Sequence, residues 1–133
     1  MYTISVDAKQ RVVQVVLGGM LTVAEVEAYM RDLRHALIKA AIGSNYAIVI
    51  DVSSCGIQTQ DMIQAMGMHM ATMPRARSIA IVSVSALARM QVRRLFHQDY
   101  ARVVSTLDEG LAWVLHNHEP ALDQPANFQG AGA

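Results

Sequence analysis

The chain contains little cysteine, few aromatic residues and little charge. Cys55 is the single cysteine in 133 residues, aromatic residues make up 5% of the sequence, and charged residues make up 17%. One cysteine excludes an internal disulfide, and the opening segment has no basic leader followed by an apolar core, so we expect a cytoplasmic protein. Scarce aromatics argue against base stacking, so no nucleic-acid partner is expected.

Long apolar runs are also missing. The longest stretches without Asp, Glu, Lys or Arg are residues 12–24 and 62–74, and both are shorter than the roughly 20 apolar residues that a membrane-spanning helix needs. No membrane span is therefore expected. Hydrophobic residues nevertheless make up 53% of the sequence, which excludes a disordered chain and leaves surplus apolar surface. That surplus predicts a homodimer.

The first part of the chain has the pattern of a hairpin followed by a helix. Alternating apolar and polar residues predict antiparallel strands over residues 2–6 and 11–17. Thr22 and Glu25 have the spacing of a capping box, which predicts a helix over residues 23–41. Its buried face is expected to carry apolar residues at helical spacing, namely Val26, Met30, Leu33, Leu37 and Ala41.

The rest of the chain alternates between strands and helices. Residues 46–52 and 79–84 are continuous apolar runs, typical of strands buried on both faces. Helices are expected over residues 60–73 and 86–97, and a short strand over 102–105. A second capping box at Thr106 and Glu109 opens a last helix through His116. Such βαβ alternation implies parallel strands with right-handed crossovers.

These elements predict one α/β domain over residues 1–118. It has a mixed central sheet with an N-terminal antiparallel hairpin, parallel βαβ units and about four helices. Residues 119–133 hold two prolines and a Gly-Ala end, and are expected to form a disordered tail.

Polar residues gather after the first buried strand, at Asp51, Ser53, Ser54 and Cys55. Open α/β sheets commonly bind ligands at this end of their strands. The hydroxyls can equally satisfy backbone amides of the loop and the next helix. A nucleophile needs a base within hydrogen-bond reach, and the sequence places no histidine nearby. The histidines form no convincing metal set either, so we expect no catalytic, metal or cofactor site.

Methionines form a stripe along one face of the helix predicted over residues 60–73. Met62, Met66, Met70 and Met73 follow the spacing i, i+4, i+8 and i+11. The stripe can pack into the core, or it can form an adaptable docking surface because thioether side chains fit varied apolar partners. Met68 lies on another face and is the methionine expected to be exposed.

The order of elements resembles the STAS fold, and within it the SpoIIAA-like group. The similar stretches are residues 15–33, VVLGGMLTVAEVEAYMRDL, and residues 47–66, AIVIDVSSCGIQTQDMIQAM. In the anti-sigma-factor antagonists of this family, a strand ending in Asp precedes a segment with a phosphorylated serine. Asp51 matches that aspartate. The segment would fall within residues 56–61, which contain no serine and offer only Thr59 as a hydroxyl acceptor.

The resemblance implies a non-enzymatic regulatory or binding module that acts by protein–protein contact. The predicted contact surface is the loop after Asp51 together with the methionine-rich helix, comprising Asp51, Ser53, Ser54, Thr59, Met62, Met66 and Met70. The alternative is a carrier of a small apolar or lipid-like ligand, because the STAS fold is similar to lipid-carrying folds and methionines can line such a pocket. An enzyme would need a cleft that joins Ser53 or Cys55 to a distant histidine.

Overall fold

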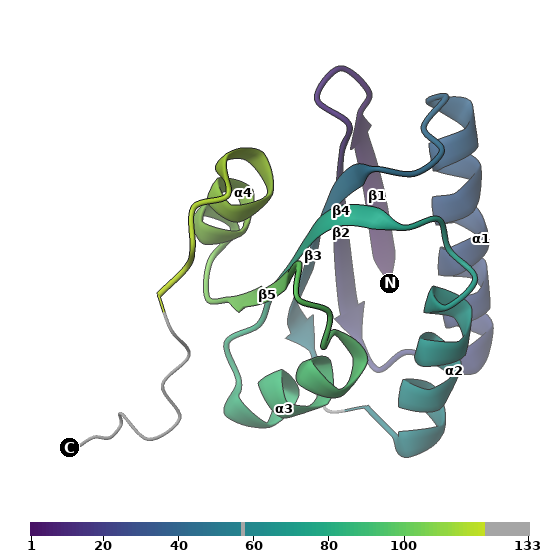
Figure 1. The fold of residues 1–133 in the computed structure, drawn as a ribbon. Helices are drawn as coiled ribbons and strands as arrows, with labels where there is room; N and C mark the ends of the chain where they lie inside the picture. The colour runs from purple at the N-terminus through teal and green to yellow at the C-terminus, as the bar shows by residue number, and fades with distance from the viewer. Residues whose placement is uncertain (57, 122–133) are drawn as a thin grey trace.

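A five-stranded mixed sheet lies between two layers of helices (Figure 1). The computed structural model describes residues 1–56 and 58–121. The strands lie in the order β1 (Tyr2–Asp7), β2 (Val12–Gly19), β3 (Tyr46–Cys55), β4 (Ala76–Val82) and β5 (Ala101–Val104). The first pair is antiparallel, and every other neighbouring pair is parallel.

The helices of the described residues are α1 (Val23–Lys39), α2 (Gln60–Met70), α3 (Ala86–Leu95) and α4 (Leu107–His116). The predicted α/β fold, with its N-terminal hairpin, parallel units and four helices, is confirmed over this part of the chain. None of these helices is long and apolar enough to cross a membrane.

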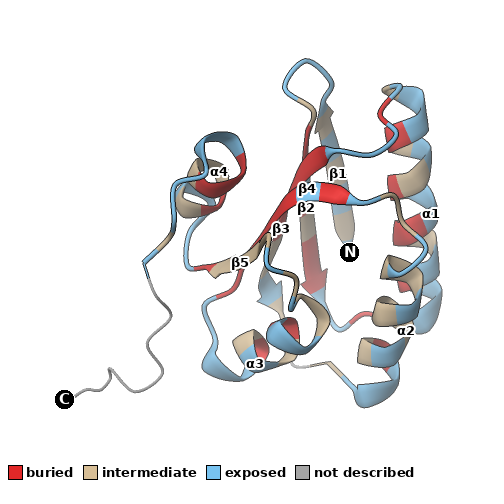
Figure 2. Cartoon of the chain, in the orientation of Figure 1, coloured by how far each residue is buried: buried red, intermediate tan, exposed pale blue. Residues whose placement is uncertain are grey.

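Each face of the sheet has its own hydrophobic core. Successive side chains of a strand point to opposite faces, so Ile48 and Ile50 of β3 join the core under α1, while Ala47 and Val49 join the core under α4. Figure 2 shows buried residues along the central strands and on the sides of α1 and α4 that face them. The helices α1, α2 and α3 share one face of the sheet, and α4 covers the other.

Strand β3 is longer than the sequence predicts. The expected end was residue 52, but a register shift lets Gly18 and Gly19 of β2 pair with Ser54 and Cys55. Ser53 and Ser54 therefore belong to the strand, and the prediction that they lie in a loop is wrong. The glycines extend the pairing because they leave room at the edge where β2 turns towards α1, with Gly19 at a positive φ of 76°.

Strand β4 is displaced towards the N-terminus relative to the predicted range of 79–84. It begins at Ala76 and ends at Val82 because the Ser85 hydroxyl caps α3 by accepting the amide hydrogen of Ala88, at 3.3 Å. Ser83 and Val84 are then needed to link the strand to the helix. Helices α1, α2 and α3 each end two or three residues before the predicted position.

One of the two predicted capping boxes is complete. The Thr22 hydroxyl accepts the Glu25 amide at 3.1 Å, and the Glu25 carboxylate accepts the Thr22 amide at 3.1 Å. At the start of α4 the Thr106 hydroxyl accepts the Glu109 amide, also at 3.1 Å. The Glu109 carboxylate, however, accepts the amide of Ser105 and not that of Thr106, so the second motif is a shifted version of the predicted box.

Ala41 lies outside α1, and the prediction that it belongs to the buried face is wrong. Its φ is 59° and its side chain is exposed. The Ile42 amide donates to the Leu37 carbonyl at 2.8 Å, and the Ala41 amide donates to the Ile38 carbonyl at 3.0 Å. These two bonds form a Schellman motif, which turns Ile42 into the core in place of Ala41.

Replacing Ala41 with Gly is expected to stabilise the protein by roughly 0.5–1 kcal/mol, because glycine adopts a left-handed conformation without the strain that a Cβ atom causes. Urea denaturation followed by circular dichroism measures the change. Ala41→Val is the matched control, and its β-branched side chain should destabilise the protein at the same position. A loss of stability in Ala41→Gly would contradict the assignment of this turn.

The first residues of the predicted tail include a structured contact. Glu119 forms a two-point ion pair with the Arg102 guanidinium, at 2.8 and 2.9 Å. That guanidinium also lies 4.2 Å from the centre of the Trp113 ring. Residues 122–133, the remainder of the predicted disordered tail, lie outside the described residues.

Candidate ligand-binding cavity

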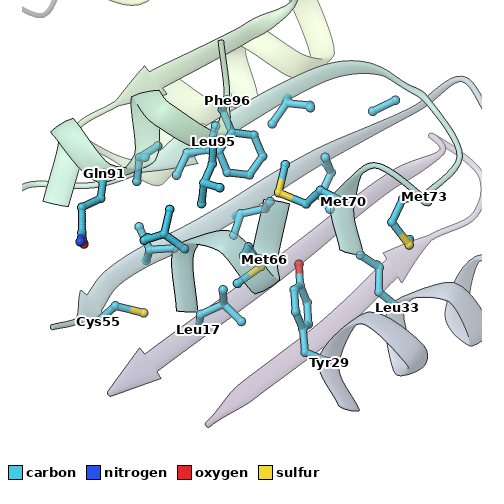
Figure 3. Close-up of a pocket in the computed structure, with 18 of the residues that line it drawn as sticks. Leu17, Tyr29, Leu33, Cys55, Met66, Met70, Met73, Gln91, Leu95 and Phe96 are labelled. Carbon is cyan, nitrogen blue, oxygen red and sulfur yellow. The ribbon is translucent and has the colours of Figure 1, made fainter. Parts of the chain in front are cut away.

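An apolar cavity of about 410 Å³ lies between the sheet and the helices α1, α2 and α3. Its floor is the face of the sheet that carries Leu17, Ile50 and Ile81, and its walls come from the three helices and the loops that join them to the strands. Figure 3 shows the elongated space, with Cys55 and Gln91 towards one end and Met73 and Leu33 towards the other.

The cavity exists because α2 packs mainly against its neighbouring helices and not against the sheet. Its contacts are chiefly with α1 on one side and α3 on the other. Met62 is the only α2 residue that is fully buried, with 3% of its surface exposed. The helix therefore spans the gap between α1 and α3 and leaves unfilled volume above the strands.

The methionine stripe faces this cavity. Met62, Met66, Met70 and Met73 all line it, and the last three are half-buried and packed against the core. Met68 is 74% exposed, which confirms the prediction that it is the outward-facing methionine of the helix. The stripe thus faces inward, as the helical spacing indicates. It borders the open volume of the cavity, whereas one of the two expectations was that it packs into a filled core.

Two glutamines that bond to each other line one end of the cavity. The Gln58 amide N–H donates to the Gln91 side-chain oxygen at 3.0 Å, and the Gln91 side-chain nitrogen donates to the Gln58 carbonyl at 2.7 Å. Cys55 lines the same end. Burial raises the pKa of the Cys55 thiol, and the charge of Asp51 raises it further. The thiol is therefore protonated at neutral pH and is a weak nucleophile.

Tyrosines supply polar atoms within the cavity. The Tyr46 hydroxyl donates to the Pro74 carbonyl at 2.8 Å, and burial raises its pKa to about 12. Burial also raises the pKa of Tyr29, which is 3% exposed. Within the described residues the Tyr29 hydroxyl has no hydrogen-bond partner. Figure 3 shows it pointing into the cavity, close to Met66 and Met70.

The predicted site residues on β3 lie apart from the methionines. Asp51 follows Ala47 and Val49 in the strand alternation, so it belongs to the sheet face that α4 covers. The Ser53 amide and hydroxyl both donate to the Asp51 carboxylate, at 2.9 and 2.5 Å. These side chains satisfy each other locally, and exposed Ser54 does not line the cavity.

Thr59 acts as the N-cap of α2. Its side chain is exposed, and its hydroxyl accepts the amide hydrogen of Met62 at 3.2 Å. This contact fixes the first turn of the helix that carries the methionine stripe. Thr59 therefore holds the cavity wall in place without lining the cavity itself.

Several lining residues were missed by the sequence interpretation. Tyr29 has helical spacing with Val26 and Leu33, so the periodicity of α1 already placed it on the buried face. Arg75, Gln98 and Tyr100 come from loops or strand ends, where no periodic signal exists. They reach the cavity because of how the elements are arranged in space, which the sequence pattern does not encode.

No group of three or more His, Cys, Asp or Glu side chains in residues 1–56 and 58–121 is arranged to hold a metal ion. No protein-family model matches the chain, and no curated protein matches its sequence. The resemblance to the SpoIIAA-like group stays a prediction, and the functional argument rests on the cavity.

Proposed function

We propose that this protein is a non-enzymatic binding protein that holds a small apolar or amphiphilic ligand in the cavity beneath α2. The observation that carries the proposal is the cavity itself, which is about 410 Å³ in volume and lined mainly by aliphatic, aromatic and methionine side chains. Ligand pockets in proteins have volumes of roughly 300–1,000 Å³ and linings of this kind.

The energetic cost of an unfilled apolar cavity supports the binding of a ligand there. Protein interiors are packed as densely as organic crystals, and atoms that border an empty apolar space lose their dispersion contacts on that side. A bound apolar molecule restores those contacts. The unbranched side chains of Met66, Met70 and Met73 adjust to the shape of such a molecule more easily than branched side chains do.

The direction of the methionine stripe favours this function over the predicted docking of a protein partner on α2. Met66 and Met70 are turned towards the cavity, and Met68 is the only large hydrophobic residue that α2 exposes. A partner on the solvent side of α2 would therefore meet little apolar surface. The regulatory partner, the homodimer and the cytoplasmic location remain predictions from the sequence.

Filling the cavity provides the test. Met66→Trp places a larger side chain in the cavity, and we expect it to weaken binding of the neutral apolar fluorophore N-phenyl-1-naphthylamine by roughly tenfold or more, because the ring competes for the same volume. Fluorescence titration measures the change. Met68→Trp is the matched control on the same helix, and it should bind the fluorophore as the unaltered protein does.

Circular dichroism and thermal unfolding establish that each variant is folded. Ala88→Leu narrows the cavity from the opposite wall on α3, and provides a second variant if Met66→Trp fails to fold. Equal binding by the unaltered protein and a folded variant with a narrowed cavity would exclude this cavity as the binding site.

A further inference from the structure

The polar atoms of the cavity are unevenly distributed along its length. Lining residues of β3 run from Tyr46 to Cys55, which is roughly 30 Å of extended strand. At the Cys55 end the glutamine pair satisfies its own hydrogen bonds. At the Tyr46 end the lining includes Arg75, Gln98 and Tyr100, and the buried side-chain oxygen of Gln98 has no hydrogen-bond partner.

Arg75 is the one cationic side chain among the described residues that line the cavity. Its guanidinium carbon lies 4.9 Å from the centre of the Tyr100 ring, a stacking contact that leaves the guanidinium hydrogens available to an acceptor. Within the described residues no carboxylate pairs with Arg75. The nearby acidic residues act on a different arginine, because Glu119 forms its ion pair with Arg102 and the charge of Asp99 also acts on Arg102.

Two further residues that line the cavity carry a polar group without a hydrogen-bond partner in the described residues. The side-chain oxygen of Gln98 is buried and accepts no hydrogen bond, and the Tyr29 hydroxyl is unpaired in the described residues. A 180° rotation of the Gln98 amide presents its nitrogen as a donor in place of its oxygen. Arg75 and Gln98 can thus both donate hydrogen bonds to a negatively charged group at the Tyr46 end. Tyr29 lies nearer the middle of the cavity, between Leu17 and Leu33 in Figure 3, with its ring 5.7 Å from that of Tyr2.

Resting on the proposed function, we infer that the ligand is a single-chain amphiphile with a carboxylate head, held at the Arg75 end while its apolar chain runs along the methionine stripe towards Cys55. Guanidinium groups bind carboxylates through paired hydrogen bonds. Arg75 is exposed, so the charged head stays at the rim in contact with water while the chain is buried. The volume lies at the small end of the usual range, which favours one chain over two.

Comparing an acid with its uncharged ester tests the head group. The probes are cis-parinaric acid and its methyl ester, which share one fluorescent chain and differ in charge. The unaltered protein is expected to bind the acid roughly tenfold more tightly than the ester, and Arg75→Gln should remove that difference by weakening acid binding alone. Arg77 lies two residues after Arg75, and its side chain does not line the cavity. Arg77→Gln removes the same positive charge and should leave the affinities for the acid and the ester unchanged.

A second variant separates recognition from folding. Gln98→Leu removes a buried oxygen that has no hydrogen-bond partner, so it should leave the unfolding transition unchanged or raise it while it weakens acid binding about threefold or more and spares the ester. Equal binding of acid and ester, unaffected by Arg75→Gln, would overturn the head-group inference and leave the apolar cavity in place. Failure of both probes and of N-phenyl-1-naphthylamine to bind would overturn the proposed function as well.

Discussion

Trp113→Ala is expected to lower the free energy of unfolding by about 3–5 kcal/mol, because it removes the largest side chain between α4 and the sheet and leaves a cavity. Trp113 is 7% exposed and packs in the smaller core with Val49, Ala80 and Val104. Its indole nitrogen also donates to the Tyr100 carbonyl at 3.3 Å. Among the described residues α4 is the one helix that covers this face of the sheet, so no neighbouring helix there compensates for the loss.

Urea denaturation measures this effect, with Leu115→Ala on the same helix as the control. Leu115 is 37% exposed, and its truncation should cost less than about 1 kcal/mol. Equal losses of stability in the two variants would show that α4 does not anchor the second core.

Gly110→Leu is expected to destabilise the protein by about 3 kcal/mol or more through overpacking. A Cβ atom at Gly110 would lie 3.2 Å from Val49 Cγ1, 3.4 Å from Ala80 Cβ and 3.5 Å from Val104 Cγ2. The absence of a side chain therefore lets α4 approach the sheet closely. A leucine has no free direction there, and α4 must move away from the strands to accommodate it.

A pair of smaller substitutions separates this effect from helix propensity. Gly67 lies in α2, where an added Cβ would come only 3.5 Å from Leu95 Cδ2. Gly67→Ala should therefore gain up to about 1 kcal/mol of helix propensity. Gly110→Ala gains the same helix propensity, but the close contacts of its added Cβ atom offset that gain. This variant should therefore be no more stable than the unaltered protein. A stabilised Gly110→Ala would contradict the close approach of α4.

The sequence predicted the order of elements because each local pattern agreed with the final arrangement. Continuous apolar runs marked β3 and β4, and the capping box at Thr22 marked the start of α1. The boundaries moved where a tertiary pairing decided them. Pairing with Gly18 and Gly19 carried β3 through Ser54 and Cys55, and no feature of residues 53–55 alone shows that these glycines will be beside them.

The methionine stripe shows where sequence periodicity stops being informative. Helical spacing correctly predicts that Met62, Met66 and Met70 share a face, and that Met68 does not. It does not report how far α2 lies from the sheet, because that distance depends on how α1 and α3 support the helix from its sides. The difference between a packed core and a cavity is therefore invisible in the pattern.

The polar end of the cavity was unpredictable for a related reason. Arg75 and Gln98 are separated in sequence and lie outside the helices, so they converge only after β4 and β5 pair. Asp51 and Ser53, by contrast, were chosen for their position after a buried strand, and they occur on the opposite face of the sheet from the cavity. Strand alternation determines that separation.

Native mass spectrometry of the delipidated protein with an equimolar single-chain carboxylic acid tests the central claim most directly. We predict a one-to-one complex with the unaltered protein and with Met68→Trp, and a strongly reduced complex with folded Met66→Trp. The free protein in the same spectra also reports whether the chain is a dimer. An equal amount of complex in all three proteins, or none with the unaltered protein, would contradict the assignment of the cavity beneath α2 as a ligand site.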